Sequence, residues 1–241
     1  MNIKNSISEF SPMKYARIGG ILYLIIIIAG LFGQLLVRNA LVIPGDPTET
    51  ANKIVNSEFL WRIGISADLV MQICDLPLML IFYLLLKPVN KNLALLNLLF
   101  NLIQTAVLVA NKLNLLTALF LLGDATYLKT FNPDQLHTLS YIYIRLHDAG
   151  FGVGLIFFGF VCLIEGYLIF KSGYFPKAIG ILMQIAGLCY LINCFTLILA
   201  PKLLSVFVLV PCLIGELSLC LWLIFKGVNM TEWNKLVEEK K

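Results

Sequence analysis

Ionisable side chains recur inside long apolar stretches of this chain, at spacings that put them on shared helical faces. Asp68, Gln72 and Asp75 are separated by four and three residues, so one face of a helix carries all three. Arg145 and Asp148 lie three residues apart in another apolar stretch. A charge at the centre of a bilayer costs about 2.5–3.5 kcal/mol on insertion scales, so we expect these side chains to face the interior of a helix bundle rather than lipid.

Amide side chains form a second stripe, in the apolar stretch between those two. Spacings of four, three, seven and three residues describe one helical face that carries Asn97, Asn101, Gln104, Asn111 and Asn114. Because polar stripes on neighbouring membrane helices normally face one another, we predict one interior polar cavity lined by Asp68, Gln72, Asp75, Gln104 and Asn111. The alternative is that the amides only join helices, through hydrogen bonds of about 0.6–2 kcal/mol each.

The charges within these stretches do not balance when histidine is neutral. The acids are Asp68, Asp75, Asp148, Glu165 and Glu216, and the bases are Arg62, Lys112 and Arg145. A buried surplus of carboxylates is relieved when the carboxylates take up protons or when a cation binds. We therefore predict binding or transport of a small cationic or proton-coupled ligand, in a polar cavity that opens to the outside. The predicted ligand-binding residues are Asp68, Gln72, Asp75, Gln104, Asn111, Arg145, His147, Asp148 and Glu216.

Some of these charges have a purely structural alternative. The long side chains of Arg62 and Lys112 can snorkel to the outer membrane interface. Glu165 lies near the inner end of its segment and can pair with Lys171 or Lys177.

Two other classes of function remain open. In an intramembrane enzyme, His147 and nearby carboxylates would act as acid and base or hold a metal. The chain has only two histidines, which excludes a three-histidine zinc site. His137 is about 15 Å from His147 along one helix, which is too far for the two to share a metal without a break in that helix. We therefore predict no metal site and can name no cofactor. In a structural or assembly protein, the polar stripes would instead meet a partner's helix.

Composition places all these residues in a membrane. The chain has 241 residues, of which 59% are hydrophobic and only 13% charged, and its mean hydropathy is +0.88. These values exclude a soluble globular domain and intrinsic disorder. The predicted fold is all-α, a single polytopic domain over residues 1–241. Its six transmembrane helices are expected at Tyr15–Val37, Leu60–Leu86, Leu93–Leu122, Thr138–Phe170, Pro176–Leu199 and Leu203–Phe225.

Lysine and arginine residues predict that both termini are cytoplasmic. With six spans, one side of the membrane holds Lys4, Lys14, Arg17, Lys87, Lys91, Lys171, Lys177, Lys226, Lys235, Lys240 and Lys241. The loops of the other side hold Arg38, Lys53, Lys129 and Lys202. Residues 39–59 are then an extracytoplasmic loop, in which Asp46 caps a short surface helix that ends near Asn56. Residues 227–241 form a cytoplasmic tail.

Several features have a simple packing interpretation. All six cysteines lie inside apolar runs, so we expect no disulfides. Glycines in the fourth segment, including Gly159 and Gly166, favour close helix packing. Pro77 and Pro211 each interrupt a segment near a carboxylate. The basic residues lie at segment ends and not on one face, so the net charge of +4 does not indicate nucleic-acid binding.

Several short motifs together resemble a bacterial membrane family known only as domain of unknown function 4386. They are Ala16-Arg17-Ile18-Gly19-Gly20, Ile43-Pro44-Gly45-Asp46, the segment Trp61 to Asp68, Cys74-Asp75, the block from Leu146-His147 to Gly159, and Gly166-Tyr167-Leu168. The resemblance implies a six-span integral membrane protein and supplies no catalytic or binding residues. It suggests the bacterial cytoplasmic membrane as the location and the lipid bilayer as a partner. Six spans are few for a carrier that acts as a monomer, so we also expect a homodimer.

Overall fold

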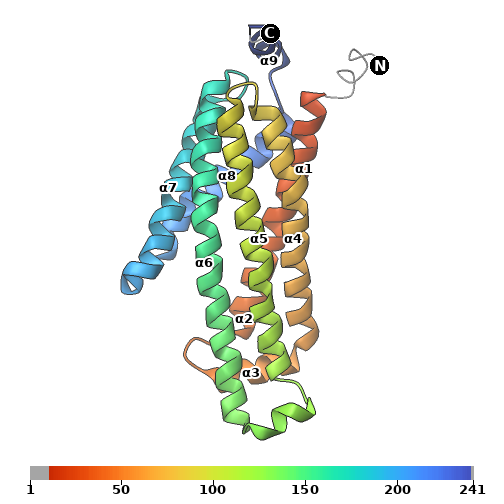
Figure 1. Cartoon of the computed structure of the whole chain (residues 1–241), viewed down its shortest axis with the longest axis vertical. Coiled ribbons are helices and arrows are strands. Elements are labelled where there is room, and N and C mark those ends of the chain that lie inside the picture. Colours follow the sequence, from red (N-terminus) through yellow and green to blue (C-terminus); the bar gives the residue numbers. More distant parts are fainter. Residues whose placement is uncertain (1–10, 240–241) are drawn as a thin grey trace. The chain divides into compact units, whose positions relative to one another are not determined.

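Helices are the only regular secondary structure in the described part of the chain. A computed structural model describes residues 11–239, without the side chain of Val206. Within these residues, six helices are long and apolar enough to cross a membrane: Pro12–Leu41, Glu58–Leu86, Lys91–Leu121, Pro133–Ser172, Lys177–Leu199 and Phe207–Phe225. The predicted all-α fold with six spans is confirmed, and the protein is a multi-pass membrane protein (Figure 1).

The first span is composite. It consists of α1 (Pro12–Leu31), a π-helix η2 (Phe32–Arg38) and the short α2 (Asn39–Leu41). The π-helix changes the rotational phase of the residues that follow it, and such segments are frequent at functional sites. The span therefore continues past Val37, where the sequence predicted its end.

The sixth span begins later than predicted. Two short 3₁₀ turns, η4 (Pro201–Leu203) and η5 (Val206–Leu209), precede α8 (Val210–Phe225). Pro211 therefore lies in the first turn of α8 and does not interrupt a helix. In that position its missing N–H costs nothing, because the first amides of a helix have no intrahelical acceptor.

The remaining helices are α3 (Pro47–Asn56), α4 (Glu58–Leu86), α5 (Lys91–Leu121), α6 (Pro133–Ser172), α7 (Lys177–Leu199) and α9 (Met230–Glu239), with a 3₁₀ turn η3 (Thr126–Thr130). Asp46 caps α3 by accepting a hydrogen bond of 2.9 Å from the backbone N–H of Glu49. Pro77 lies inside α4.

The chain divides into two compact units. The first unit contains residues 11–24, Cys74–Gln104 and 155–239 of the described chain. The second unit contains Ile25–Ile73 and Thr105–Gly154. Four helices, α1, α4, α5 and α6, each contribute one part to each unit.

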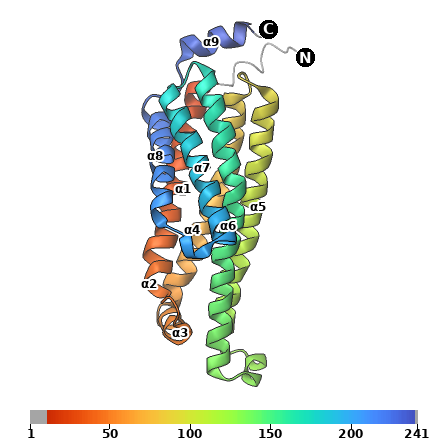
Figure 2. The ribbon, with the colours of Figure 1, turned by 90° about the vertical axis from the view of Figure 1, so that its left-hand side faces the viewer.

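Glycines let the helices of the first unit pack closely, with α7 between α8 and the C-terminal part of α6 (Figure 2). A Cβ atom at Gly166 would lie 2.6 Å from the carbonyl oxygen of Gly180. One at Gly187 would lie 2.7 Å from the carbonyl oxygen of Gly159. These two pairs keep a constant antiparallel register between α6 and α7, which confirms the predicted packing role of Gly159 and Gly166.

Tyr174, in the connection between α6 and α7, contacts both α4 and α9 at one end of the first unit. Its hydroxyl donates a 2.5 Å hydrogen bond to the carbonyl of Leu85, at the end of α4. Its ring lies 4.9 Å from that of Trp233 in α9, and its own carbonyl accepts from the N–H of Asn229. Burial raises the pKa of Tyr174, so the hydroxyl stays a donor throughout the physiological range.

The second unit has its own apolar core. Trp61, Ile65, Leu115 and Ile144 are buried together, and the indole N–H of Trp61 donates to the carbonyl of Leu115 at 3.2 Å. Figure 1 shows α3 lying crosswise at the end of this unit, where its Ile54 is fully buried in the core.

Most of the basic residues that predict the orientation belong to the first unit: Lys14, Arg17, Lys87, Lys91, Lys171, Lys177, Lys226 and Lys235. Lys4, Lys240 and Lys241 lie outside the described residues. Arg38, which the prediction counted in a loop, is buried within the first span. The asymmetry of the loops is therefore stronger than predicted, and the orientation stays a prediction.

The close approach of Gly166 and Gly180 predicts that a side chain at Gly166 destabilises the protein. Gly166→Ala should lower the free energy of unfolding by about 1–3 kcal/mol, because α6 and α7 must separate to admit the methyl group. The matched control is Gly30→Ala, whose Cβ would lie 3.2 Å from the sulfur of Met71, an end of a flexible side chain. In detergent, the midpoint temperature of thermal unfolding of Gly166→Ala should be well below that of Gly30→Ala. Equal stability of the two variants would contradict the close packing.

The orientation is tested by accessibility. In a cysteine-free background, single cysteines at Lys53 and Lys129 should react with a membrane-impermeant maleimide in intact cells. Cysteines at Lys91 and Lys177 should react only after permeabilisation, because both termini are predicted to be cytoplasmic. Labelling of the cysteine at position 91 in intact cells would contradict the predicted orientation.

Candidate functional site

A buried aspartate with two cationic partners is the centre of the polar site in the second unit. Asp68 in α4 is fully buried. Its Oδ2 lies 2.6 Å from Nη1 of Arg38 and 2.8 Å from Nζ of Lys112, and its Oδ1 lies 3.5 Å from Nη2 of Arg38. The carboxylate therefore meets a cation from the first span and another from α5.

Lys112 extends this cluster to α6. Its Nζ lies 3.1 Å from Nε2 of His147, and its ammonium sits 5.7 Å from the centre of the Phe151 ring. Lys112 and His147 are each only 2% exposed. Arg38, Asp68, Lys112 and His147, from four spans, are hereafter called the charged quartet.

Local backbone features make room for the quartet. Arg38 is the last residue of the π-helix η2, and its Nε donates to Oε1 of Gln34 at 3.0 Å. Gly33, in the same segment, lets η2 approach α4, since a Cβ there would lie 2.5 Å from Oδ1 of Asp68. The ion pair thus depends on both the helix type and the glycine.

Two basic residues lie in different places from those predicted. Arg38 was counted as a loop residue, although Gln34 and Arg38 share a helical face by their spacing of four, and that spacing was an available signal. Snorkelling of Lys112 to the interface is wrong, because its ammonium is buried against Asp68. An ion pair across helices outweighs the tendency of a long side chain to reach water.

Arg145 and Asp148 do not face the interior. They form the predicted local pair, at 3.2 Å, but their side chains are 64% and 43% exposed. The expectation that both point into a bundle is therefore wrong. Their mutual neutralisation lets them stay at the surface of α6. Arg62 likewise pairs with Glu58 at 2.7 Å on an exposed face.

Asn111 joins helices. Its Nδ2 donates to the backbone carbonyl of His147 at 2.8 Å, and its Oδ1 accepts from Asn114 at 2.8 Å. The bond to His147 ties α5 to α6 beside the quartet, and the bond from Asn114, which also lies in α5, orients the Asn111 amide. Gln72 is buried in the same unit, and its Oε1 has no hydrogen-bond partner in the described part of the chain.

The first unit holds a second polar group, which we call the carboxylate cluster: Asp75, Glu165 and Glu216. Asp75 accepts from Nδ2 of Asn101 at 3.3 Å. Glu165 is hydrogen-bonded by the side chain of Asn97. The negative charges of Asp75 and Glu216 both act on Glu165, so the three acids repel one another when ionised.

Tyrosines surround the third acid of the cluster. The hydroxyl of Tyr190 donates to Oε1 of Glu216, and the hydroxyl of Tyr23 is a further hydrogen-bond partner. Tyr23 packs edge-on against Phe82 and Tyr190 against Phe158. Glu216 therefore lies among aromatic rings, with neutral donors on its carboxylate.

Among the described residues, neither Glu165 nor Glu216 forms an ion pair. The pairing of Glu165 with Lys171 or Lys177 is wrong, because these ammonium groups lie over the rings of Tyr167 and Phe170. Glu165 is missing from the predicted site although it is 4% exposed. Its spacing of three and four from the buried Cys162 and Ile169 was the signal that places it inside.

Gln104, the remaining predicted site residue, is buried in the first unit with no partner for its Oε1 in the described chain. The predicted set therefore divides, with Asp75, Gln104 and Glu216 in the first unit and the other members in the second. No three His, Cys, Asp or Glu side chains of residues 11–239 lie close enough to hold a metal ion. The six cysteines are all free, as predicted.

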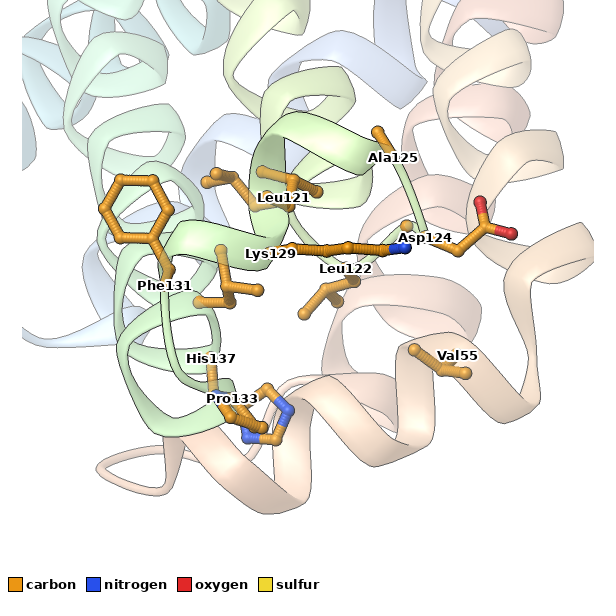
Figure 3. Close-up of a pocket in the computed structure, with 12 residues that line it drawn as sticks. Val55, Leu121, Leu122, Asp124, Ala125, Lys129, Phe131, Pro133 and His137 are labelled. Atoms are coloured by element: carbon orange, nitrogen blue, oxygen red, sulfur yellow. The ribbon is translucent and has the colours of Figure 1, made fainter.

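A pocket of about 300 Å³ lies elsewhere in the second unit, between α3, the end of α5 and the start of α6 (Figure 3). Its walls are mostly apolar, with Val55 on one side and His137 on another. It contains none of the predicted ligand-binding residues.

Residues 18–227 match the family described as "Domain of unknown function (DUF4386)". The chain belongs to this family. The region of this chain that matches DUF4386 includes the whole charged quartet and the whole carboxylate cluster. A protein of Archaeoglobus fulgidus, described as an uncharacterized protein, is 30% identical over 160 residues, which cover 66% of this chain and 81% of the relative. No solved structure matches this DUF4386 chain.

The charged quartet predicts that replacing its one acid by the neutral amide strongly destabilises the protein. Asp68→Asn should lower the free energy of unfolding by about 3–5 kcal/mol, because Arg38 and Lys112 then stay buried without a counter-charge. Adding Lys112→Met should restore part of that loss, by about 0.5–3 kcal/mol, since one buried cation is removed. Equilibrium unfolding in mixed micelles measures the free energy of unfolding of the single and the double variant.

The control for this cycle is Glu58→Gln, which breaks the exposed pair with Arg62 and should change stability by no more than about 1 kcal/mol. An Asp68→Asn variant as stable as Glu58→Gln would show that the quartet carries no buried ion pair.

Proposed function

We propose that this DUF4386 protein binds a proton or a small cation at the carboxylate cluster and moves it within the membrane. The observation that carries the proposal is the absence of an ion pair at Glu165 and Glu216 within the described chain, although both belong to membrane-spanning helices. A site of this kind is incomplete until positive charge enters it.

Neutral donors support the same conclusion. The tyrosine hydroxyls beside Glu216 and the Asn97 amide beside Glu165 satisfy carboxylate lone pairs, but they leave the negative charge of these two acids uncompensated. Protons or a cationic ligand supply the missing charge. Carboxylates near the middle of transmembrane helices are used in this way by proton and ion carriers.

The aromatic rings favour an organic cation as the alternative to a proton. Tyr23 and Tyr190 flank Glu216, and aromatic faces beside a carboxylate suit an ammonium group. Gln104 supplies a further amide oxygen in the same unit.

Three finer points belong to this proposal. We infer that both termini are cytoplasmic, that the protein resides in a bacterial plasma membrane, and that two copies associate, because six spans are few for one carrier.

The experiment uses purified protein in lipid nanodiscs. Its thermal stability is followed against pH in N-methylglucamine chloride, and then on addition of sodium or tetramethylammonium chloride. We expect wild-type stability to fall as pH rises, because ionised carboxylates repel one another, and we expect Glu165→Gln with Glu216→Gln to abolish that dependence.

Stabilisation of the wild type by one added cation, lost in the double variant, would identify a cation site. Dependence on pH without any cation effect would identify a proton site. The matched control, Glu58→Gln, should behave as wild type. A double variant with the wild-type dependence on pH and salt would overturn the proposal.

A further inference from the structure

The charged quartet holds one surplus positive charge. Arg38 and Lys112 are cations, Asp68 is the only acid among the four, and His147 accepts from Lys112 and so is neutral. An unbalanced charge in a buried membrane site is costly, whereas loss of a single proton would balance it. The quartet therefore has two natural states that differ by one proton.

The geometry assigns the tautomer of His147. Because the Lys112 ammonium has only donors, Nε2 of His147 must be the acceptor and Nδ1 must carry the ring proton. This Nδ1 is buried and has no hydrogen-bond partner in the described residues. It lies 3.7 Å from Oδ1 of Asp148, whose side chain is 43% exposed.

We propose that Lys112, His147 and Asp148 form a proton relay between the buried quartet and the exposed face of α6. The proposal stands independently of the carboxylate cluster, which lies in the other unit. Its components are a buried proton donor, an imidazole with two ring nitrogens and a surface carboxylate. Nζ of Lys112 lies 3.1 Å from Nε2 of His147, and Nδ1 of His147 lies 3.7 Å from Oδ1 of Asp148.

The transfer conserves atoms and charge. An Nζ–H bond of Lys112 breaks as an Nε2–H bond of His147 forms, and the Nδ1–H bond breaks as an O–H bond forms on Asp148. Lys112 becomes a neutral amine that accepts from Nε2–H and still donates to Asp68. Asp148 then releases the proton to water, and the buried charge falls from one to zero.

The length of α6 supports access to water. Its 40 residues extend about 60 Å, twice the thickness of about 30 Å of a bilayer's hydrocarbon core, so much of the helix lies outside that core. Asp148 is 43% exposed and pairs with Arg145, which is 64% exposed. A charged pair this open is suited to the aqueous boundary.

The groups around the relay are few. Asp68 from α4 and Arg38 from η2 face Lys112, and Phe151 from α6 lies beside both Lys112 and His147. Arg38 stabilises the ionised Asp68 when Lys112 loses its proton. Arg145 stabilises the ionised Asp148 after release. Asn111 holds the backbone of His147 at 2.8 Å, which positions the ring.

The test is nitrogen NMR of the full chain, labelled with ¹⁵N-histidine, in lipid nanodiscs. The chain has two histidines, so His137→Gln assigns both. We expect His147 to be neutral with its proton on Nδ1, and to switch to the Nε2–H tautomer as pH rises. In Lys112→Met the switch should disappear, and His147 should gain an imidazolium form in acid.

A kinetic measurement separates a relay from a structural role. Asp148→Asn should keep the tautomer switch but slow exchange of the ring proton with water by about 10²-fold, because a general acid–base partner is lost. Lys91→Met, an exposed lysine of the first unit, should change nothing. An imidazolium His147 in wild type, a switch that persists in Lys112→Met, or an unchanged exchange rate in Asp148→Asn would each overturn the proposal.

Discussion

A charge buried in an apolar membrane interior must be met by an opposite charge, a proton or a ligand, and the polar sites of this protein follow from that constraint. In the second unit Asp68 is met by two cations, at 2.6 and 2.8 Å. In the first unit Glu165 and Glu216 are met by neutral amides and hydroxyls. One site is therefore rich in positive charge and the other in negative charge.

Close packing makes the first of these sites feasible. The π-helix brings Arg38 to the face of α4, and Gly33 leaves the space that the Asp68 carboxylate fills. A side chain at Gly33 or a regular α-helical phase after Leu31 would displace the guanidinium. Backbone geometry thus positions the charges, and the charges in turn hold separate spans together.

The opposite charge surpluses give the two sites different chemistry. A cation-rich cluster gains stability by releasing a proton, whereas an acid-rich cluster gains stability by taking up a proton or a cation. The two proposals therefore assign to this DUF4386 chain one site that releases positive charge and one that takes it up.

The number of spans, their approximate limits and the cap of α3 could be predicted from the sequence, because hydropathy, length and capping are local properties of a segment. That α4 and α5 each carry polar side chains on one face was also predictable, since helical spacing defines a face. The partners of each charge were not. Arg38 turned inward, Glu165 lacked the expected lysine, and Arg145 stayed exposed. These outcomes depend on how each helix is rotated against its neighbours, and only the tertiary packing decides that rotation.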